Sequence, residues 1–295
     1  MAGGGGVRLL VNPGGGRGRT GRHLERLRRL AAGRALELVV SADVADLEAA
    51  GRRAAADGVD RLLVAGGDGT LHHALQGLAH HGCALAILPL GSGNDLAAAL
   101  GIPRDLSAAF DLALTGAARP IDLGRVAGRF FAGVAGVGFD SEVNRYANRI
   151  RRLRGPLIYP WAVVRTLRSF GAPTMRIEHD SGRFEGRAMF AAVANSGRYG
   201  GGMRIAPAAR LDDGWLDLVI VREIPRRALL RVFPRVFRGG HVTHPAVELV
   251  RTRRLTLALD RPLTAYGDGE PLVEIGAEPV VFEVAPAALR VVAPT

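Results

Sequence analysis

Lysine is absent from this 295-residue chain, so all 39 side chains counted as Lys or Arg are arginines. Without lysine there is no Schiff-base nucleophile, no lysine general base and no phosphate-binding lysine of the P-loop type. Cysteine occurs once, at Cys83, which excludes a disulfide scaffold. Because 48% of the residues are hydrophobic, the chain is expected to fold, and its length favours two domains.

Long hydrophobic runs are also missing. The longest nearly apolar run, residues 130–139, is about half the length that a bilayer span needs. The N-terminus, Met1 and Ala2 followed by four glycines, has neither the charged nor the apolar region of a secretory signal. We therefore expect a cytoplasmic protein that reaches a membrane only peripherally, at its inner face.

Acidic residues are outnumbered by basic ones, 28 to 39, which gives a formal net charge of +11. This charge favours anionic partners, which include nucleic acids, anionic membrane surfaces and phosphorylated ligands. No helix-turn-helix, zinc-finger spacing or RNA-recognition aromatic pair is present, and only 5% of the residues are aromatic. No nucleic-acid partner is therefore expected, and the oligomeric state is not predicted.

The hydrophobic pattern divides the chain near residue 122. Before it, short apolar runs alternate with helical patterns, which predicts a mostly parallel sheet covered by helices. The expected strands are 7–11, 35–40, 61–65 and 85–88, and the expected helices are 21–32, 45–57, 70–80, 95–100 and 106–114. After it, strand-like runs predict an antiparallel sandwich with two helical insertions, 141–169 and 225–237. Its expected strands are 129–136, 174–178, 187–194, 216–221, 255–259 and 280–284.

Glycine-rich loops follow three of the predicted parallel strands, at residues 12–16, 66–70 and 90–95. Ligands of open α/β sheets bind at the carboxyl ends of the strands, where glycine allows backbone N–H groups to approach phosphate oxygens. One such loop is a weak signal, but three at one sheet edge predict a nucleotide.

Asp68 lies inside the second of these loops. A carboxylate among phosphate-binding amides repels the phosphate unless Mg²⁺ intervenes or the carboxylate binds a hydroxyl. Alternatively, Asp68 caps a helix that starts near Thr70. The loop alone leaves both interpretations open.

The segment Gly66-Gly67-Asp68-Gly69-Thr70 resembles the nucleotide-binding signature shared by lipid kinases, NAD kinases and phosphofructokinases. Further motifs of the same kind occur elsewhere in the chain, before and after this segment. They are Asn12-Pro13, Pro89-Leu90-Gly91-Ser92-Gly93-Asn94-Asp95, Gly136-Val137-Gly138-Phe139-Asp140, Tyr199-Gly200-Gly201-Gly202, the stretch 209–217 and Asp268-Gly269-Glu270. Together they resemble the bacterial branch of the diacylglycerol kinase catalytic family, which is similar to sphingosine kinases.

The resemblance implies an α/β N-terminal domain with a mostly parallel sheet, like that of NAD kinases and phosphofructokinases, over residues 1–123. It implies an all-β sandwich C-terminal domain over 124–286, on the side of the lipid substrate. The last strand, within 287–295, is expected to return to the first domain, and the active site to lie in the cleft between the domains.

The resemblance also assigns an ATP site. The corresponding residues are Asn12, Pro13, Gly14, Gly15, Gly16, Ser41, Gly66, Gly67, Asp68, Gly69, Thr70, Leu71, His72, Ser92, Asn94 and Asp95. Ser41 and Ser92 stand where relatives have threonine, and serine keeps the hydroxyl.

The resemblance implies that Glu270 is the general base. Transfer of phosphate to an alcohol needs a carboxylate that accepts the hydroxyl proton. Asp268 is the second candidate, acting on metal or orientation. From the residues alone, Asp268-Gly269 is equally the signature of a β-hairpin turn.

A second Mg²⁺ site, away from the chemistry, is also implied. Its ligands are the Asp213 side chain and the carbonyl oxygens of Arg210 and Trp215, an all-oxygen set that suits a hard cation. The residues alone again predict only a turn in this segment.

Two histidine pairs, His72-His73 and His80-His81, depart from the pattern of relatives, many of which have Asn and Glu at the first pair. Adjacent helical residues point in different directions and no zinc-ligand spacing accompanies them, so we expect a solvated helix face rather than zinc.

Two basic and apolar stretches are candidate membrane surfaces. One combines Arg145, Arg149, Arg151, Arg152 and Arg154 with Leu157, Ile158, Tyr159, Trp161, Val163 and Val164; the other combines Arg226, Arg227, Arg231, Arg235 and Arg238 with Leu229, Leu230, Val232, Phe233, Val236 and Phe237. Amphipathic helices packed on the sandwich explain both stretches equally well.

We therefore predict an ATP- and Mg²⁺-dependent kinase acting on diacylglycerol or a related lipid alcohol. The alternatives are an NAD kinase or other small-molecule kinase with the same loop, and a non-catalytic nucleotide-binding protein associated with the membrane. The sequence does not identify the lipid.

Overall fold

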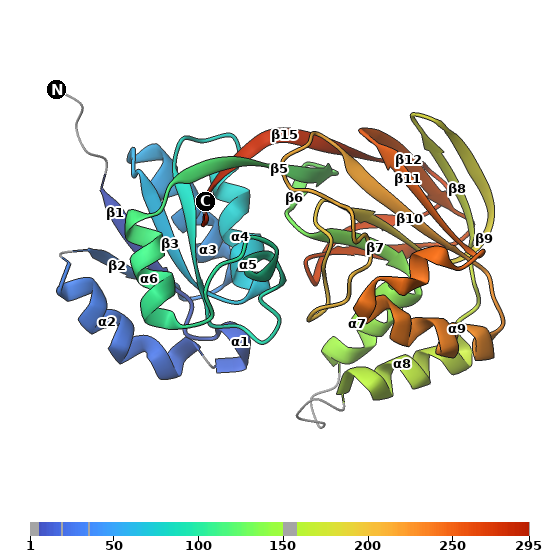
Figure 1. The fold of residues 1–295 in the computed structure, drawn as a ribbon, viewed down its shortest axis with the longest axis horizontal. Coiled ribbons are helices and arrows are strands. Elements are labelled where there is room, and N and C mark those ends of the chain that lie inside the picture. Colours follow the sequence, from blue (N-terminus) through green and yellow to red (C-terminus); the bar gives the residue numbers. More distant parts are fainter. Residues whose placement is uncertain (1–5, 19, 35, 150–157, 295) are drawn as a thin grey trace. The chain divides into compact units, whose positions relative to one another are not determined.

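The computed structural model describes residues 6–18, 20–34, 36–149 and 158–294 (Figure 1). The chain divides into two compact units. The first, called unit 1, comprises residues 1–123, 211–213 and 285–295, and the second, unit 2, comprises 124–210 and 214–284.

Unit 1 is built on a parallel sheet. Its strands run in the order β2 (Glu37–Val40), β1 (Val7–Val11), β3 (Arg61–Gly66), β4 (Ala84–Pro89) and β15 (Val280–Val292), and β5 (Ala118–Val126) pairs with β15. The central strands β3 and β4 are apolar along almost their whole length, because both faces of a parallel sheet are covered.

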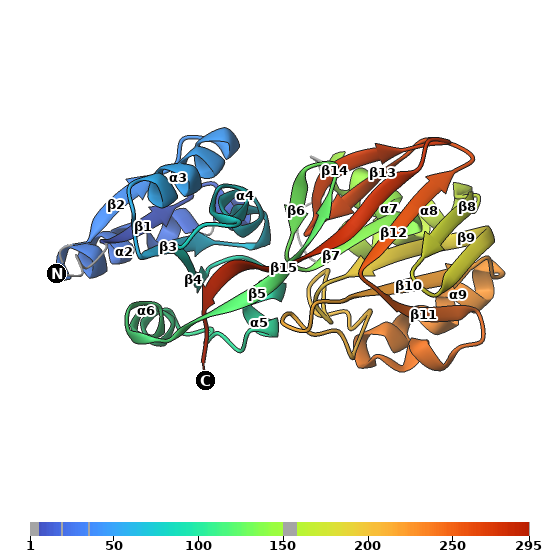
Figure 2. The same ribbon diagram turned by 90° about the horizontal axis from the view of Figure 1, so that it is seen from above.

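Helices cover this sheet. They are α1 (Gly15–Gly18), η1 (Thr20–His23), α2 (Leu24–Ala32), α3 (Val44–Ala56), α4 (Asp68–Leu78), α5 (Asp95–Ala99) and α6 (Leu106–Thr115). Figure 2 shows α3 and α4 on one face and α6 on the other. Helices α3 and α4 are in close contact at Gly77 of α4, because a Cβ atom on this residue would lie 2.5 Å from the backbone nitrogen of Arg52 in α3.

Unit 2 is an antiparallel sandwich whose two sheets share β9 (Gly182–Ala194). One sheet contains β7 (Val134–Gly138), β10 (Leu216–Arg222), β11 (Val247–Thr252), β13 (Leu263–Gly267) and β14 (Glu270–Ile275). The other contains β8 (Thr174–His179), β12 (Arg254–Leu259) and the first part of β15. Strand β6 (Arg129–Phe131) pairs antiparallel with the end of β5. The expected fold class, a parallel α/β part followed by a β sandwich, is confirmed.

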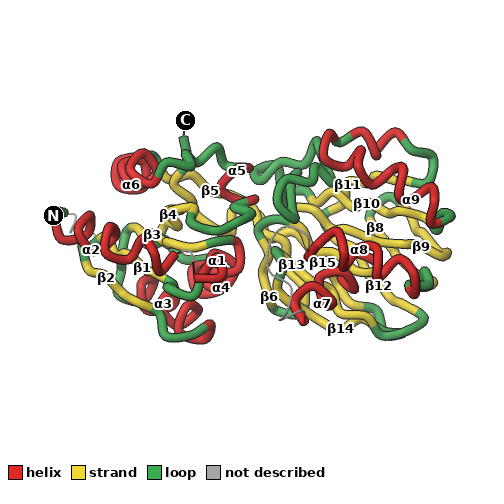
Figure 3. Tube along the Cα trace, turned by 90° about the horizontal axis from the view of Figure 1, so that it is seen from below, coloured by secondary structure: helices red, strands yellow, loops and turns green. Residues whose placement is uncertain are grey.

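Both faces of the first sheet of unit 2 are buried. Along β10, Leu218 and Ile220 face the sandwich interior, whereas Val219 and Val221 join a second cluster beneath helices. These helices are α7 (Phe139–Arg149), α8 (Ile158–Ser169) and α9 (Arg226–Val232), continued by η2 (Phe233–Arg238) and η3 (Gly240–Thr243). They lie together on one side of the strands (Figures 1 and 3).

Several strand predictions need correction. The expected strand 129–136 is interrupted after Phe131, because the Asp268 carboxylate binds the amides of Ala132 and Gly133. The expected strand 280–284 and the last strand, expected within 287–295, are one strand, β15. Strands β5, β11, β13 and β14 were not predicted, because their alternation is broken by glycine, proline or charged residues.

Candidate functional site

The three glycine loops of unit 1 lie at one edge of its sheet. Strands β1, β3 and β4 are adjacent and parallel, so their carboxyl ends meet. Two loops are joined directly, because the Asn12 side-chain amide donates a hydrogen bond to the Thr70 hydroxyl at 3.1 Å. The other end of the Asn12 amide accepts from the Gly14 N–H at 3.0 Å, which shapes the first loop.

The second and third loops touch at glycines. A Cβ atom on Gly91 would lie 2.4 Å from the Gly67 Cα, and one on Gly67 would lie 2.9 Å from the Gly91 Cα. No side chain fits at either position unless the loops separate. The glycines therefore keep two backbone segments in contact at the sheet edge.

The Asp68 carboxylate links the same two loops. It accepts hydrogen bonds from the N–H of Asn94, the N-cap of α5, at 2.7 Å and from the N–H of Asp95, the first residue of α5, at 2.8 Å. Asn94 has a left-handed backbone, with φ of 56°. Helix α4 begins at Asp68 with Gly67 as its N-cap, so the interpretation of Asp68 as the cap of that helix is wrong. Asp68 caps α5 instead.

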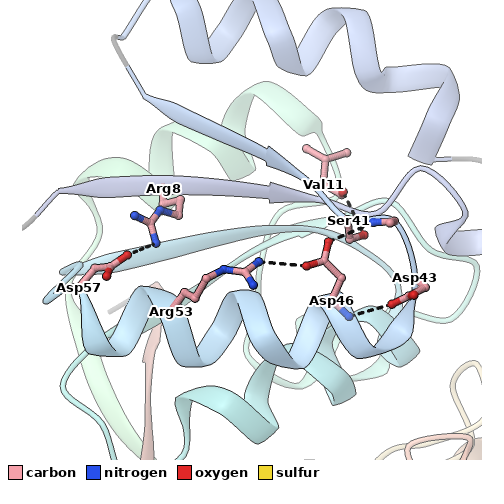
Figure 4. A network of polar contacts seen from close by, with 8 residues as sticks. Arg8, Val11, Ser41, Asp43, Asp46, Arg53 and Asp57 are labelled. Atoms are coloured by element: carbon pink, nitrogen blue, oxygen red, sulfur yellow. Dashed lines mark hydrogen bonds and ion pairs between the residues drawn. The ribbon is translucent and has the colours of Figure 1, made fainter.

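Ser41 follows β2 and lies beside the end of β1. Its N–H donates to the Val11 carbonyl oxygen at 3.0 Å, and its hydroxyl lies 3.4 Å from the same oxygen. The Asp46 carboxylate holds the segment after Ser41, because it accepts from the Ala42 N–H at 3.1 Å and from Arg53 at 3.0 Å (Figure 4). The hydrogen bond from Arg53 is the main cause of the lowered pKa of Asp46.

The remaining residues of the expected ATP site differ in exposure. Ser92 is exposed in the third loop, while Gly69 lies half-buried in the first turn of α4. The side chains of Leu71 and His72 are 2% and 1% exposed, so they pack inside unit 1. The expectation of a solvated face is therefore wrong for His72; His73 is half-buried, and its Nδ1 lies 3.2 Å from Glu48.

This edge fits a magnesium nucleotide in its chemistry. Glycine backbones and helix N-termini supply N–H groups for phosphate. A Cβ atom on Gly93 would lie 2.7 Å from an Asp68 oxygen and 3.5 Å from an Asp95 oxygen, so two carboxylates gather there. Oxygen donors of this kind suit Mg²⁺. Among the described residues, no cluster of three His, Cys, Asp or Glu side chains is present.

Glu270 in unit 2 follows a tight hairpin turn. Asp268 and Gly269 connect β13 to β14 with φ values of 54° and 91°, so the turn interpretation is confirmed. The Asp268 carboxylate accepts from the N–H groups of Ala132 and Gly133 at 2.9 and 2.8 Å. Glu270, the first residue of β14, is therefore carried on a turn that is tied to the connection between β6 and β7.

The segment of the second expected Mg²⁺ site forms turns before β10. Asp213 is half-buried, and the neighbouring Asp212 pairs with Arg119 at 3.3 Å. The Leu211 carbonyl oxygen accepts from the Asp122 N–H at 2.6 Å. The Arg210, Asp213 and Trp215 ligand set stays a prediction.

Unit 2 also contains an apolar cavity that the sequence did not predict. It has about 630 Å³ of space not filled by atoms, part of it open to solvent, and it lies among α7, β9, β10, α9 and η2. Its lining is apolar except for Asp140, Tyr199 and His241. The motifs that contain Asp140 and Tyr199 and the apolar residues of 226–238 were the available signals, whereas nothing in the sequence marked His241.

His241 is 3% exposed in this lining. Its Nε2 lies 2.9 Å from the Ile205 carbonyl oxygen and therefore carries the proton, and burial lowers the pKa of the side chain. The neutral ring is thus an integral part of the apolar wall.

Comparisons with known proteins agree with these features. The family model for the "Diacylglycerol kinase catalytic domain" matches residues 6–126. The family model for the "YegS C-terminal NAD kinase beta sandwich-like domain" matches residues 133–293. Diacylglycerol kinase from Mycobacterium tuberculosis (strain ATCC 25618 / H37Rv) is 36% identical over 264 residues, covering 87% of this chain and 84% of the relative. The chain belongs to the diacylglycerol kinase family.

A second family member, diacylglycerol kinase from Bacillus subtilis (strain 168), is 31% identical over 270 residues, covering 90% of this chain and 89% of the relative. The fold is also similar to that of a protein from Bacillus anthracis str. Sterne whose crystal structure is known. The TM-score is 0.79 and the sequence identity is 23%, and the match covers 98% of this chain and 97% of the other chain. The predicted family and the assignment as a lipid kinase are confirmed. Within the described part of the chain, no helix combines the length and apolar character that a bilayer crossing requires.

Proposed function

We propose that the protein transfers the γ-phosphate of ATP to the free hydroxyl of diacylglycerol at the inner face of a membrane. Membership of the diacylglycerol kinase family supports this proposal, as do the joined glycine loops of unit 1. The observation that carries the proposal is that two aspartates hold the glycine loops of unit 1 and the turn before Glu270 in unit 2. Asp68 ties the nucleotide loops together, and Asp268 fixes the turn before Glu270.

The loops of unit 1 are proposed to bind the triphosphate of ATP. Their backbone N–H groups contact phosphate oxygens, and Ser41 and Ser92 supply hydroxyls. Asp68 and Asp95 are the carboxylates that would hold Mg²⁺, which would neutralise charge on the phosphates. The second Mg²⁺ site is proposed at Asp213, with carbonyl oxygens from the same segment.

Glu270 is proposed as the general base. The lipid hydroxyl oxygen forms a bond to the γ-phosphorus as the bond from that phosphorus to the β–γ bridging oxygen breaks, and ADP leaves. The hydroxyl proton passes to the Glu270 carboxylate. Asp268 is proposed as a positioning residue, because its carboxylate binds the amides of Ala132 and Gly133 and thereby holds the turn before Glu270.

The apolar cavity of unit 2 is proposed to receive an acyl chain of the acceptor. Its lining consists almost entirely of apolar side chains, which match a hydrocarbon. Asp140 is the one acidic side chain among the lining residues and would contact the polar end of the lipid.

The proposal is tested with labelled ATP, Mg²⁺ and mixed micelles that contain diacylglycerol, followed by identification of the labelled product. Phosphatidic acid is expected. Glu270→Gln should lower kcat by about 10²- to 10⁴-fold with little change in the KM for ATP. Glu274→Gln is the control, because Glu274 is exposed on the same strand.

Other outcomes would overturn parts of the proposal. Labelled NADP formed from NAD, without labelled lipid, would identify an NAD kinase. Binding of ATP without phosphate transfer to any lipid would identify a non-catalytic nucleotide-binding protein. Equal rates for Glu270→Gln and Glu274→Gln would remove Glu270 from its role.

A further inference from the structure

The segment formed by α9 and η2, residues 226–238, has two chemically different faces. Four apolar residues line the cavity of unit 2: Leu229, Val232, Phe233 and Val236. Their spacing of three, four and seven residues places them on one helical face. Val232 and Val236 are only 7% and 6% exposed. The inner face of this segment is therefore a wall of the cavity.

The outer face of the same segment is basic. Its five arginines are exposed: Arg226, Arg227, Arg231, Arg235 and Arg238. Within the described ranges, no ion pair is recorded for any of them, and residues 224–247 contain no Asp or Glu. Because the positive charge is not neutralised locally, this face is complementary to an anionic surface.

Large apolar side chains stand among these arginines. Leu230 is 49% exposed and Phe237 is 50% exposed, two of the most exposed large hydrophobic residues of the described chain. Arginines combined with exposed Leu and Phe are typical of helices that lie in the interface of an anionic bilayer. A nucleic acid would match the charge but would leave the two apolar side chains in water.

The two faces are mechanically connected. The Phe233 ring, in the cavity wall, packs edge-to-face on the exposed Phe237 ring with centroids 6.1 Å apart. The segment begins after Pro225 and ends at Gly239, whose φ of 73° allows the chain to turn. Movement of Phe237 into a bilayer would therefore displace part of the cavity wall.

We infer that residues 226–238 form a lid that docks on an anionic lipid bilayer and, when docked, opens the acyl-chain cavity beneath it. This inference rests on the proposed function, in which the acceptor is a membrane lipid. Docking and substrate entry are then coupled, so the enzyme exposes more of its apolar cavity where diacylglycerol is present than it does in water.

Docking is tested by co-sedimentation with phosphatidylcholine vesicles, with and without phosphatidylglycerol. The variant Arg231→Ser with Arg235→Ser should bind the anionic vesicles roughly 10- to 30-fold more weakly. The control is Arg183→Ser with Arg254→Ser, which removes the same charge from exposed positions outside the segment. An equal loss in both variants would show that net charge alone drives binding and would overturn the docking surface.

Coupling is tested with dihexanoylglycerol, which dissolves as a monomer, so its phosphorylation does not require a membrane. Anionic vesicles without diacylglycerol should lower the KM of the wild type for this substrate severalfold. The same vesicles should leave the KM of the Arg231→Ser, Arg235→Ser variant near its own vesicle-free value. An unchanged wild-type KM in the presence of bound vesicles would overturn the lid.

The two levels of the proposal fail differently. If the wild type phosphorylates neither dihexanoylglycerol nor diacylglycerol in micelles, the proposed function fails, while co-sedimentation still reports on docking. The Phe237→Trp variant gives a further readout, since its fluorescence should shift to the blue on anionic vesicles if this side chain enters the bilayer. An unshifted emission on bound vesicles would exclude Phe237 from the docking surface.

Discussion

At the scale of single residues, hydrogen bonds from backbone N–H groups to carboxylates hold the loops and the turn of the candidate site. Asp68 and Asp268 both use their carboxylates to accept two backbone N–H groups. Each residue thereby fixes a segment distant in sequence. Cys83 shows the effect of burial, which is the largest cause of the rise in the pKa of its thiol to about 11 and keeps the thiol protonated.

Gly91→Ala tests the contact between the glycine loops. The added Cβ atom would lie 2.4 Å from the Gly67 Cα and 2.7 Å from the Asn94 side-chain oxygen, so the loops must separate. We expect a loss of about 1–3 kcal/mol in the free energy of unfolding and a weakening of ATP binding by tenfold or more. Urea unfolding and ATP titration measure the two effects.

Gly82→Ala is the matched control for this change, because no atom lies within 4 Å of the added Cβ position. Its stability and ATP affinity should stay near those of the wild type. If both variants bind ATP equally well, the close approach of the loops is not needed for the nucleotide.

His241 makes stability depend on pH. Burial lowers its pKa in the folded state below the value of about 6.5 for an unfolded histidine. Below pH 6.5 the unfolded chain therefore binds more protons at this site, and the free energy of unfolding falls as the pH decreases toward the folded pKa. His241→Met should flatten this part of the dependence of Tm on pH.

The control for His241 is His81→Met, since His81 is exposed. This variant should keep the wild-type slope of Tm between pH 5 and pH 7. Identical slopes for the two variants would contradict the assigned effect of burial.

At the scale of secondary-structure elements, capping of a helix N-terminus organises the segment around Ser41 in unit 1. Asp43 is the N-cap of α3 and accepts from the Asp46 N–H at 2.9 Å (Figure 4). Asp46 in turn holds the Ala42 N–H, next to Ser41. The capping of α3 and the position of the serine are thus parts of one network.

Asp43→Ala tests this network. Loss of the cap should cost about 1 kcal/mol in the free energy of unfolding, and the KM for ATP should rise severalfold as Ser41 loses its support. Asp105→Ala is the control, because Asp105 caps α6 in the same way, at 2.9 Å from the Ala108 nitrogen. It should lower stability similarly and leave the KM for ATP unchanged; equal KM values in both variants would contradict the role of the network.

At the scale of the whole molecule, neither unit is a continuous stretch of chain. The chain leaves unit 1 after residue 123, returns for 211–213 and returns finally at 285. The end of β15 is buried in unit 1, where Leu289, Val291 and Val292 are at most 1% exposed. The first 123 residues therefore lack part of their own core.

A fragment of residues 1–123 should consequently fail to unfold cooperatively. Each of the three missing side chains contributes about 1.5–3 kcal/mol of burial, and their partners on β4 would be exposed. Joining residues 285–295 to residue 123 through a short glycine linker should restore a cooperative transition. This is feasible because the Ala287 N–H donates to the Asp122 carboxylate at 2.7 Å. Urea unfolding followed by circular dichroism compares the fragments, and cooperative unfolding of 1–123 alone would contradict the expectation.

The sequence by itself determined the family, the fold class and the positions of the three glycine loops. These depend on local signals: apolar periodicity sets the parallel strands, and glycine motifs with their spacing mark the loops that follow them. The parallel strands β1 to β4 and the helices from α2 to α6 were accordingly predicted within a few residues.

Only the tertiary structure decided what Asp68 binds, because its partners lie 26 and 27 residues away and their amides come within reach only when β3 and β4 pair. The same holds for the buried His72 and for the cavity of unit 2, whose wall is assembled from several helices and strands. Periodicity records that α9 has an apolar face, but packing determines what that face covers.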